Sequence, residues 1–167
     1  MKIIFEPRRY KIVKIAIALI AISMLGYIAY AATNLSVSNT GTVIVANKNW
    51  QIITFNPGSV PANAAACPAT GYSDVGPFTI AFGSIQQGTS AIGGVCVKNV
   101  STGGQSYTAS TAASPAPVLP TGTTVAYSAD GGTGTSGTVA PNGTSLLTIT
   151  VTAGQTLGSI TFTTSIA

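Results

Sequence analysis

The feature that most constrains the fold is a period-two alternation of apolar and polar residues that begins at residue 33. Residues 33–46 read TNLSVSNTGTVIVA, in which the even positions from 34 to 42 are polar and Ile44 breaks the rule. The apolar residues occupy the odd positions Leu35, Val37, Val43 and Val45. Successive side chains of a β-strand point to opposite faces, so this pattern is typical of a strand with one buried face. The segment is therefore predicted to form a long first strand.

The same alternation returns along the rest of the chain, and no helical period appears after residue 32. Further strands are predicted at residues 50–55, 78–85, 93–100, 105–110, 123–128, 145–153 and 159–167. Proline- and glycine-rich stretches predict loops at 59–77 and 112–122 and a flexible hairpin tip at 129–137. About eight strands at this spacing predict an all-β fold, a single Ig-like or jelly-roll β-sandwich over residues 47–167.

Residues 1–31 differ in kind from the rest of the chain. A basic segment, MKIIFEPRRYK, precedes an apolar stretch that runs to residue 32. This order is typical of a secretory signal peptide, and Ala29-Tyr30-Ala31 matches the small-x-small motif, which predicts cleavage between Ala31 and Ala32. A retained membrane-anchor helix is the alternative, because roughly 18 apolar residues approach the length needed to cross a bilayer. Both interpretations place the downstream domain at the cell surface or in the extracellular space, with membrane contact only through this leader.

The distribution of charge argues against a nucleic-acid partner. The formal net charge of +4 comes from the leader, because Lys48 and Lys98 balance Asp74 and Asp130 in the rest of the chain. Without a basic patch, nucleic-acid binding is not expected. The chain contains no histidine, which excludes Ser-His-Asp and Cys-His nucleophilic arrangements, and both aspartates lie in turn-like stretches. We expect no enzymatic activity, no cofactor and no metal site.

The cysteines and sequons point to an exported protein. Cys67 and Cys96 are the only cysteines, and in an oxidising compartment they predict one disulfide. Three N-x-S/T sequons make Asn34, Asn99 and Asn142 the candidate N-glycosylation sites. A domain with so few charges depends for solubility on hydroxyl groups or sugar, or else it is covered by neighbouring copies.

The first strand has two open interpretations. It can pair within its own sandwich, or it can be donated to an open groove in a neighbouring copy. In the second case residues 32–46 form a donor strand, and its apolar side chains Leu35, Val37, Val43 and Val45 fill pockets of the acceptor. Because such a contact does not close on itself, it would assemble identical subunits head to tail into a fibre, and the partner would be the chain itself.

The layout resembles that of archaeal surface threads and bundling pili, which are relatives of the bacterial TasA/camelysin-type biofilm-matrix fibre proteins. The resemblance is carried by the hydrophobic leader, by NLSVSNTGTVIVA, and by a Thr- and Gly-rich sandwich that closes on TVAPNGTSLLTITVTAGQTLGSITFTTSIA. It implies a structural subunit of an extracellular filament, assembled by donor-strand complementation and serving in adhesion, cell–cell bundling and biofilm matrix. It also implies that the last strand, with Ile160 and Phe162, forms a wall of the acceptor groove.

Two other functions fit the same sequence. An archaeal type IV pilin would retain its hydrophobic helix in the filament core. A membrane-anchored binding module or adhesin would hold a ligand with the loops at 59–77 and 129–137. The N-terminal residue of the protein at the cell surface distinguishes these three functions.

Overall fold

The computed structural model describes residues 19–20, 39–112, 117–132, 134–155 and 158–167. The chain divides into two units, Met1–Leu35 and Ser36–Ala167. In the first unit, the described residues Leu19 and Ile20 are helical and exposed, and the remainder of the predicted signal or anchor segment lies outside the described residues. Within the described ranges, none of the helices has the length and apolar character needed to cross a membrane.

The second unit is built almost entirely of strands. One short 3-10 helix, η1 (Ala64–Ala66), interrupts the described part of the loop between the second and third strands. The strands are β1 (Asn39–Val45), β2 (Trp50–Phe55), β3 (Phe78–Gly83), β4 (Ser90–Asn99), β5 (Gln105–Thr111), β6 (Thr124–Ala129), β7 (Ser136–Val139), β8 (Thr144–Thr152) and β9 (Thr161–Ile166).

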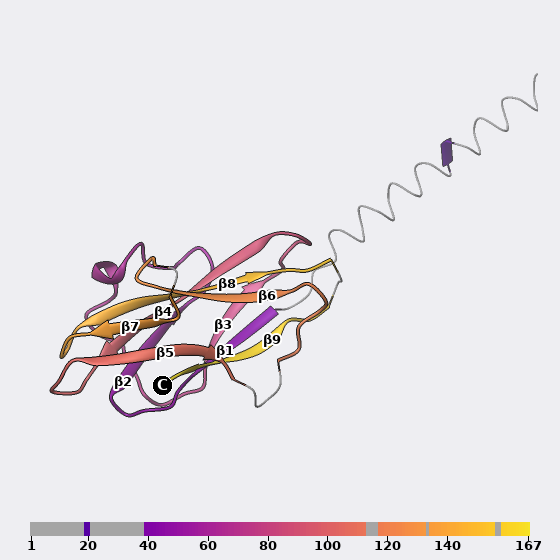
Figure 1. The fold of residues 1–167 in the computed structure, drawn as a ribbon. Coiled ribbons are helices and arrows are strands. Elements are labelled where there is room, and N and C mark those ends of the chain that lie inside the picture. The colour runs from indigo at the N-terminus through magenta and orange to yellow at the C-terminus, as the bar shows by residue number, and fades with distance from the viewer. Residues whose placement is uncertain (1–18, 21–38, 113–116, 133, 156–157) are drawn as a thin grey trace, which may run out of the picture. The chain divides into compact units, whose positions relative to one another are not determined.

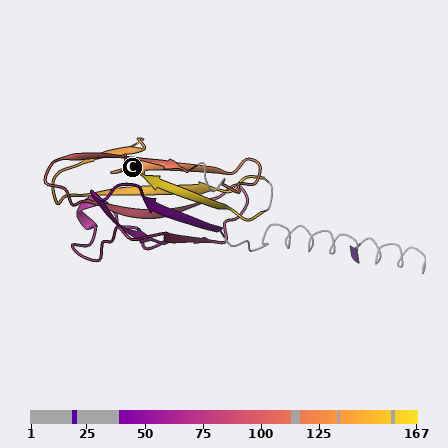
Figure 2. The same cartoon turned by 90° about the horizontal axis from the view of Figure 1, so that it is seen from below.

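These strands form two sheets that pack face to face (Figures 1 and 2). One sheet has the order β3-β1-β9-β5-β7 and the other has the order β2-β4-β8-β6. The strand pairs are antiparallel except for β1 and β9, which run parallel. The predicted all-β sandwich is confirmed. One strand was missed, because β7 lies at the end of the segment predicted as a flexible tip and buries only Val139.

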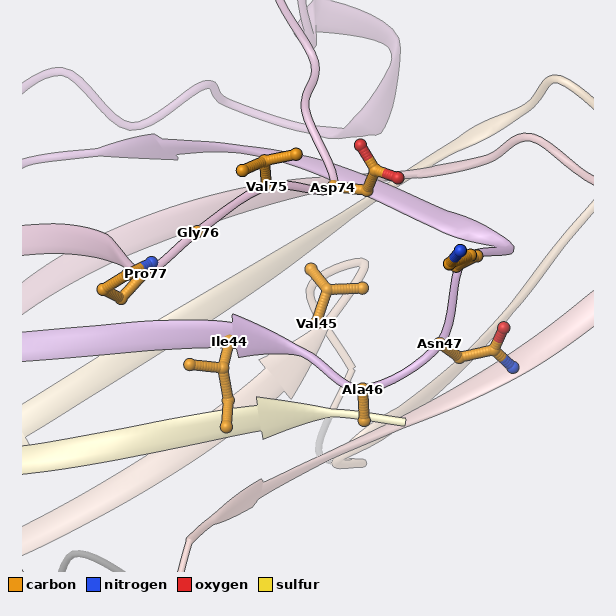
Figure 3. A pocket seen from close by; sticks show the side chains of 9 residues that line it. Ile44, Val45, Ala46, Asn47, Asp74, Val75, Gly76 and Pro77 are labelled. Carbon is orange, nitrogen blue, oxygen red and sulfur yellow. The ribbon is translucent and has the colours of Figure 1, made fainter.

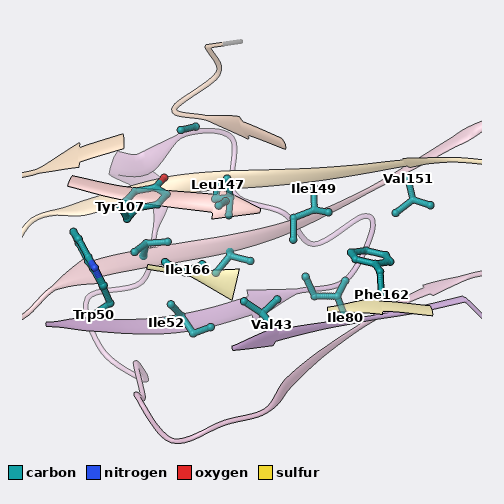
Figure 4. Close-up of a cluster of buried hydrophobic side chains, with 14 of the residues drawn as sticks. Val43, Trp50, Ile52, Ile80, Tyr107, Leu147, Ile149, Val151, Phe162 and Ile166 are labelled. Carbon is teal, nitrogen blue, oxygen red and sulfur yellow. The ribbon is translucent and has the colours of Figure 1, made fainter. Parts of the chain in front are cut away.

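The core lies between the inner faces of the two sheets, where the predicted alternation places its apolar residues (Figure 4). Trp50 of β2 meets Tyr107 of β5 edge to face, with 5.6 Å between the ring centroids. At the other end of the core, Phe82 and Phe162 lie 5.8 Å apart. Aromatic pairs of this kind contribute free energy beyond that of burying their apolar surface, so each pair stabilises the packing of two strands.

The outer face of the five-stranded sheet carries hydroxyl groups in place of charges. Its five strands contain no charged residue. In the register of the sheet, Thr42 lies between Thr79 and Thr163, and Ser106 pairs with Thr138 through a 2.9 Å hydrogen bond between their hydroxyls. The alternation of each strand therefore separates an apolar inner face from an uncharged polar outer face.

A polar chain links the two sheets through the core. The Tyr107 hydroxyl donates to the Ser145 hydroxyl at 2.7 Å, because Ser145 donates its own proton to the Asp130 carboxylate at 2.9 Å. Asp130 also accepts the Leu146 N–H at 2.9 Å. The pKa of Tyr107 is raised to about 12, mainly by burial and to a smaller extent by the negative charge of Asp130, while the Ser145 hydrogen bond acts in the opposite direction.

We expect Tyr107→Phe to lower the free energy of unfolding by about 1–2 kcal/mol near neutral pH, because the buried Ser145 oxygen loses the hydrogen bond that it accepts. The raised pKa adds a pH dependence. The folded state favours the neutral phenol, so wild-type stability is unaffected below pH 10 and falls as pH rises from the ordinary Tyr value of 10.0 towards about 12. Denaturant unfolding at several pH values should show a smaller alkaline loss in Tyr107→Phe.

Tyr72→Phe is the matched control. The Tyr72 hydroxyl is buried and has no hydrogen-bond partner among the described residues, and burial raises its pKa as well. Its removal should leave stability unchanged or raise it slightly, because no hydrogen bond is lost. Equal destabilisation by the two substitutions would contradict the role assigned to the Tyr107 hydrogen bond.

The loop between β2 and β3 covers part of the outer face of the four-stranded sheet. Its Cys67 forms a disulfide with Cys96 of β4, as the sequence predicted, with 5.9 Å between the Cα atoms. Val60 packs on Gly94, where a Cβ would lie 2.6 Å from Val60 Cγ1. Ser73 exchanges two backbone hydrogen bonds with Ile52, at 2.8 and 3.1 Å, and so covers part of the β2 edge.

Loss of this disulfide should lower the free energy of unfolding by roughly 3–4 kcal/mol, because it closes a loop with a sequence separation of 29. The double substitution Cys67→Ser and Cys96→Ser, compared with wild type in denaturant with and without reductant, measures this. Reductant should have no further effect on the double variant. Loss of all strand structure on reduction alone would contradict this account, since the core between the sheets does not include Cys67.

Candidate functional site

The candidate site is β1 and the groove that holds it. β1 lies between β3 and β9, antiparallel to the former and parallel to the latter (Figures 1 and 2). Of the predicted donor-strand residues, Val43 is fully buried and Val45 is half-buried against the core, whereas Leu35 and Val37 lie outside the described residues. In the single chain described, β1 therefore occupies its own sheet, and its two neighbours come from distant parts of the sequence.

The groove has apolar walls on its core side. β3 and β9 do not pair with each other, so β1 fills the whole gap between them. Ile80 and Phe82 of β3 and Phe162 of β9 are buried next to it. Within the chain, β9 flanks β1. Phe162 packs over Gly41, and the carbonyl of Ile160, which immediately precedes β9, accepts the Thr40 N–H at 3.0 Å.

Two residues at the N-terminal end of β1 fit the groove by shape and hydrogen bonding. The Asn39 amide group donates to the Gly83 carbonyl at 2.8 Å and accepts the Ile160 N–H at 3.1 Å, so it spans both walls. At Gly41 a Cβ would lie 2.7 Å from Phe162 Cζ and 2.9 Å from Phe82 Cε2. Neither residue was predicted as part of the site. The available signal was the break in the odd-position alternation at 39 and 41.

A short turn, residues 46–49, joins β1 to β2. The Ala46 N–H donates to the Ile166 carbonyl at 2.9 Å, and the Trp50 N–H donates to the Asn47 carbonyl at 3.2 Å. Ala46, Asn47 and Lys48 are exposed. This turn is the only covalent link between β1 and the strands that follow it. Because its side chains at 46–48 are exposed and make no contact with the core, the turn can adopt another backbone conformation without loss of core packing.

An open cavity of about 790 Å³ lies at the same end of β1 (Figure 3). Its lining contains Lys48 and Asp74 and is otherwise mainly apolar, with Val75 80% exposed. Figure 3 shows Val45 directed towards the segment that contains Val75. Within the described residues there is no group of three or more His, Cys, Asp or Glu side chains able to hold a metal ion. The cavity therefore offers a mainly apolar contact surface with one cationic and one anionic side chain.

Asp74 and Asp130 lie in different loops of the described domain. Asp74 is exposed in the loop before β3, at the cavity just described. Asp130 lies in the turn after β6, with φ of 49°, and both of its carboxylate oxygens accept hydrogen bonds. Its role in the fold is to hold the start of β8 and the Tyr107 chain, which agrees with its expected place in a turn.

The three predicted glycosylation sites differ in access. Asn34 lies outside the described residues, and Asn142 is exposed in a turn with φ of 57°. Asn99 is completely buried: its amide nitrogen donates to Gly103 and Val139 carbonyls, and its amide oxygen accepts from Ser101. A sugar on that nitrogen would remove a donor and find no space, so the folded domain does not present Asn99 as an acceptor.

Mass spectrometry of glycopeptides from the exported protein should find any sugar of the described domain on Asn142 and none on Asn99. Asn142→Gly, which removes the sequon and tolerates the positive φ, should abolish that signal without loss of stability. Asn99→Ala should lower the free energy of unfolding by about 2–3 kcal/mol, because several buried groups lose their partner. Sugar on Asn99 in folded protein would contradict this assignment.

Comparison of the chain with protein-family models, with curated protein sequences and with solved structures gave no match. A functional proposal therefore depends on the geometry of β1 and its groove and on the layout of the sequence.

Proposed function

We propose that this protein is the structural subunit of an extracellular filament, in which β1 of one copy completes the five-stranded sheet of the next. The observation that carries the proposal is the insertion of β1 between β3 and β9, two strands that do not pair with each other. The filament would serve in adhesion, cell–cell bundling and biofilm matrix, as the resemblance to surface threads and bundling pili implies.

The contacts of β1 support donation between copies. Every hydrogen bond and apolar contact that β1 makes with β3 and β9 can form equally well when the strand comes from another copy, as in domain swapping. The free-energy difference between β1 paired in its own chain and β1 donated to another copy then arises mainly from the 46–49 turn. This turn is tight in the first case and extended in the second. Because each subunit both donates a strand and receives one, the contact repeats without closing and the assembly grows into a fibre.

The charge of the domain favours self-association. Lys48, Lys98, Asp74 and Asp130 are the charged residues after the leader, and their charges cancel. A domain with no net charge has little electrostatic repulsion from its own copies. The Cys67–Cys96 disulfide supports an oxidising, extracellular setting, and the basic and apolar leader supports export through a membrane.

A cysteine pair placed across β1 and β3 tests donation between copies. Thr42 and Thr79 face each other in the register of β1 and β3. Thr42 is half-buried and Thr79 is exposed. When Thr42→Cys is in one full-length chain and Thr79→Cys is in another, the two cysteines can form a disulfide only if β1 of the first chain pairs with β3 of the second. Co-expression should yield a disulfide-linked dimer of the two single variants. The double variant should give a ladder of linked subunits on non-reducing electrophoresis, with the bond located by peptide mass spectrometry.

The control pair is Thr42→Cys with Ser110→Cys. Ser110 is exposed on β5 and is separated from β1 by β9, so a bond between these positions reports random collision. If the double variant that carries both Thr42→Cys and Thr79→Cys forms only an internally bonded monomer, and the mixed single variants stay unlinked, β1 remains in its own sheet and the proposal is wrong.

A further inference from the structure

We infer that Asn39 and Gly41 set the register of the donated strand, and we refer to these two residues as the register key. The inference rests on the proposed donation of β1 between copies. It defines the ligand that the groove accepts: an extended segment of pattern Asn-x-Gly-x-Val-x-Val, as in residues 39–45 of a second copy. The outward-facing residues between them are free to vary.

Apolar packing alone leaves the register of β1 poorly defined. A slip by one residue turns the apolar side chains to solvent, but a slip by two residues keeps them on the core side. Positions 43 and 45 both carry valine, so a two-residue slip places one valine where the other was. In a single chain the 46–49 turn prevents the slip. A strand donated by another copy lacks that restraint, so its own side chains must specify its position.

Asn39 supplies a position-specific hydrogen bond to each wall of the groove. Its side chain is 3% exposed and bonds the Gly83 carbonyl of β3 and the Ile160 N–H beside β9. These partners lie at one level of the groove, so a displaced strand leaves them and the buried amide without their hydrogen bonds. A buried polar group without a hydrogen bond destabilises the folded state, so Asn39 disfavours every other register.

Gly41 supplies a steric restraint two residues further along. The rings of Phe82 and Phe162 occupy the space that a side chain at this position would need, with ring atoms 2.7 to 3.2 Å from the site of a Cβ. A two-residue slip in one direction brings Asn39 to this place, and a slip in the other direction brings Val43. Either side chain overpacks the buried rings, which opposes both slips.

The test compares native and slipped links between full-length chains that carry one cysteine substitution each. Thr42→Cys with Thr79→Cys reports the native register, and Thr40→Cys with Thr79→Cys reports a two-residue slip that keeps both positions on the outer face. With the natural Asn39, the native link should dominate. Asn39→Ala should lower the ratio of native to slipped links by about tenfold, because the amide bonds are lost and the slipped strand brings only a methyl group to the rings.

Controls separate a change of register from a loss of folding. Ile44→Ala shortens an exposed side chain on the outward face of β1 and should leave the ratio unchanged. If Asn39→Ala does not accumulate as folded protein, Asn39→Ser gives the same readout, since its hydroxyl is too short to reach both walls. Gly41→Ala should reduce the yield of the native link several-fold, because its Cβ meets Phe162 and Phe82.

The outcomes distinguish the inference from the proposed function. Links between chains that keep the native register in both Asn39→Ala and Asn39→Ser would overturn the role of Asn39 and leave strand donation standing. An unchanged native yield in Gly41→Ala would overturn the role of Gly41 in the same way. The absence of links between chains in every variant would overturn strand donation, and the register key with it.

Discussion

The five-stranded sheet depends on β1, because β3 pairs with the described part of that sheet through β1 alone. Without this strand, the facing backbone groups of β3 and β9 would lose their partners, and Phe82 and Phe162 would be exposed to water. β1 is therefore required for a complete core. It is also joined to the strands that follow by one short exposed turn, so the requirement can be met by the same chain or by another copy.

Much of the sandwich follows from the sequence because its strands alternate so regularly. The strand predicted at 50–55 matches β2, and the strands predicted at 145–153 and 159–167 lie within one or two residues of β8 and β9. The exceptions have physical causes. β4 begins at Ser90, before its predicted start at 93, because the residues that precede Gly93 pair with the end of β8. β7 was missed because four residues with one buried side chain give no visible alternation.

The candidate site was only partly predictable. Alternation identified Val43 and Val45 as residues of a buried face, but a pattern within one strand carries no information on which strands flank it. Asn39 and Gly41 looked like interruptions, and their meaning depends on Gly83, Phe82 and Phe162, which lie far away in the sequence. The burial of Asn99 could not be predicted either, since an N-x-S/T sequence does not indicate whether its asparagine lies in an exposed turn or in the core.

The hydroxyl-covered outer face of the five-stranded sheet has a consequence for the conditions under which this protein can work. The chain has no histidine, the side chain that ordinarily changes charge between about pH 5 and 8, and the sheet presents threonines and serines that neither titrate in that range nor carry charge for salt to screen. Its surface chemistry should thus stay nearly constant in mildly acidic, neutral or saline surroundings. In the extracellular filament proposed above, such a face would present the same chemistry at different values of pH and salt.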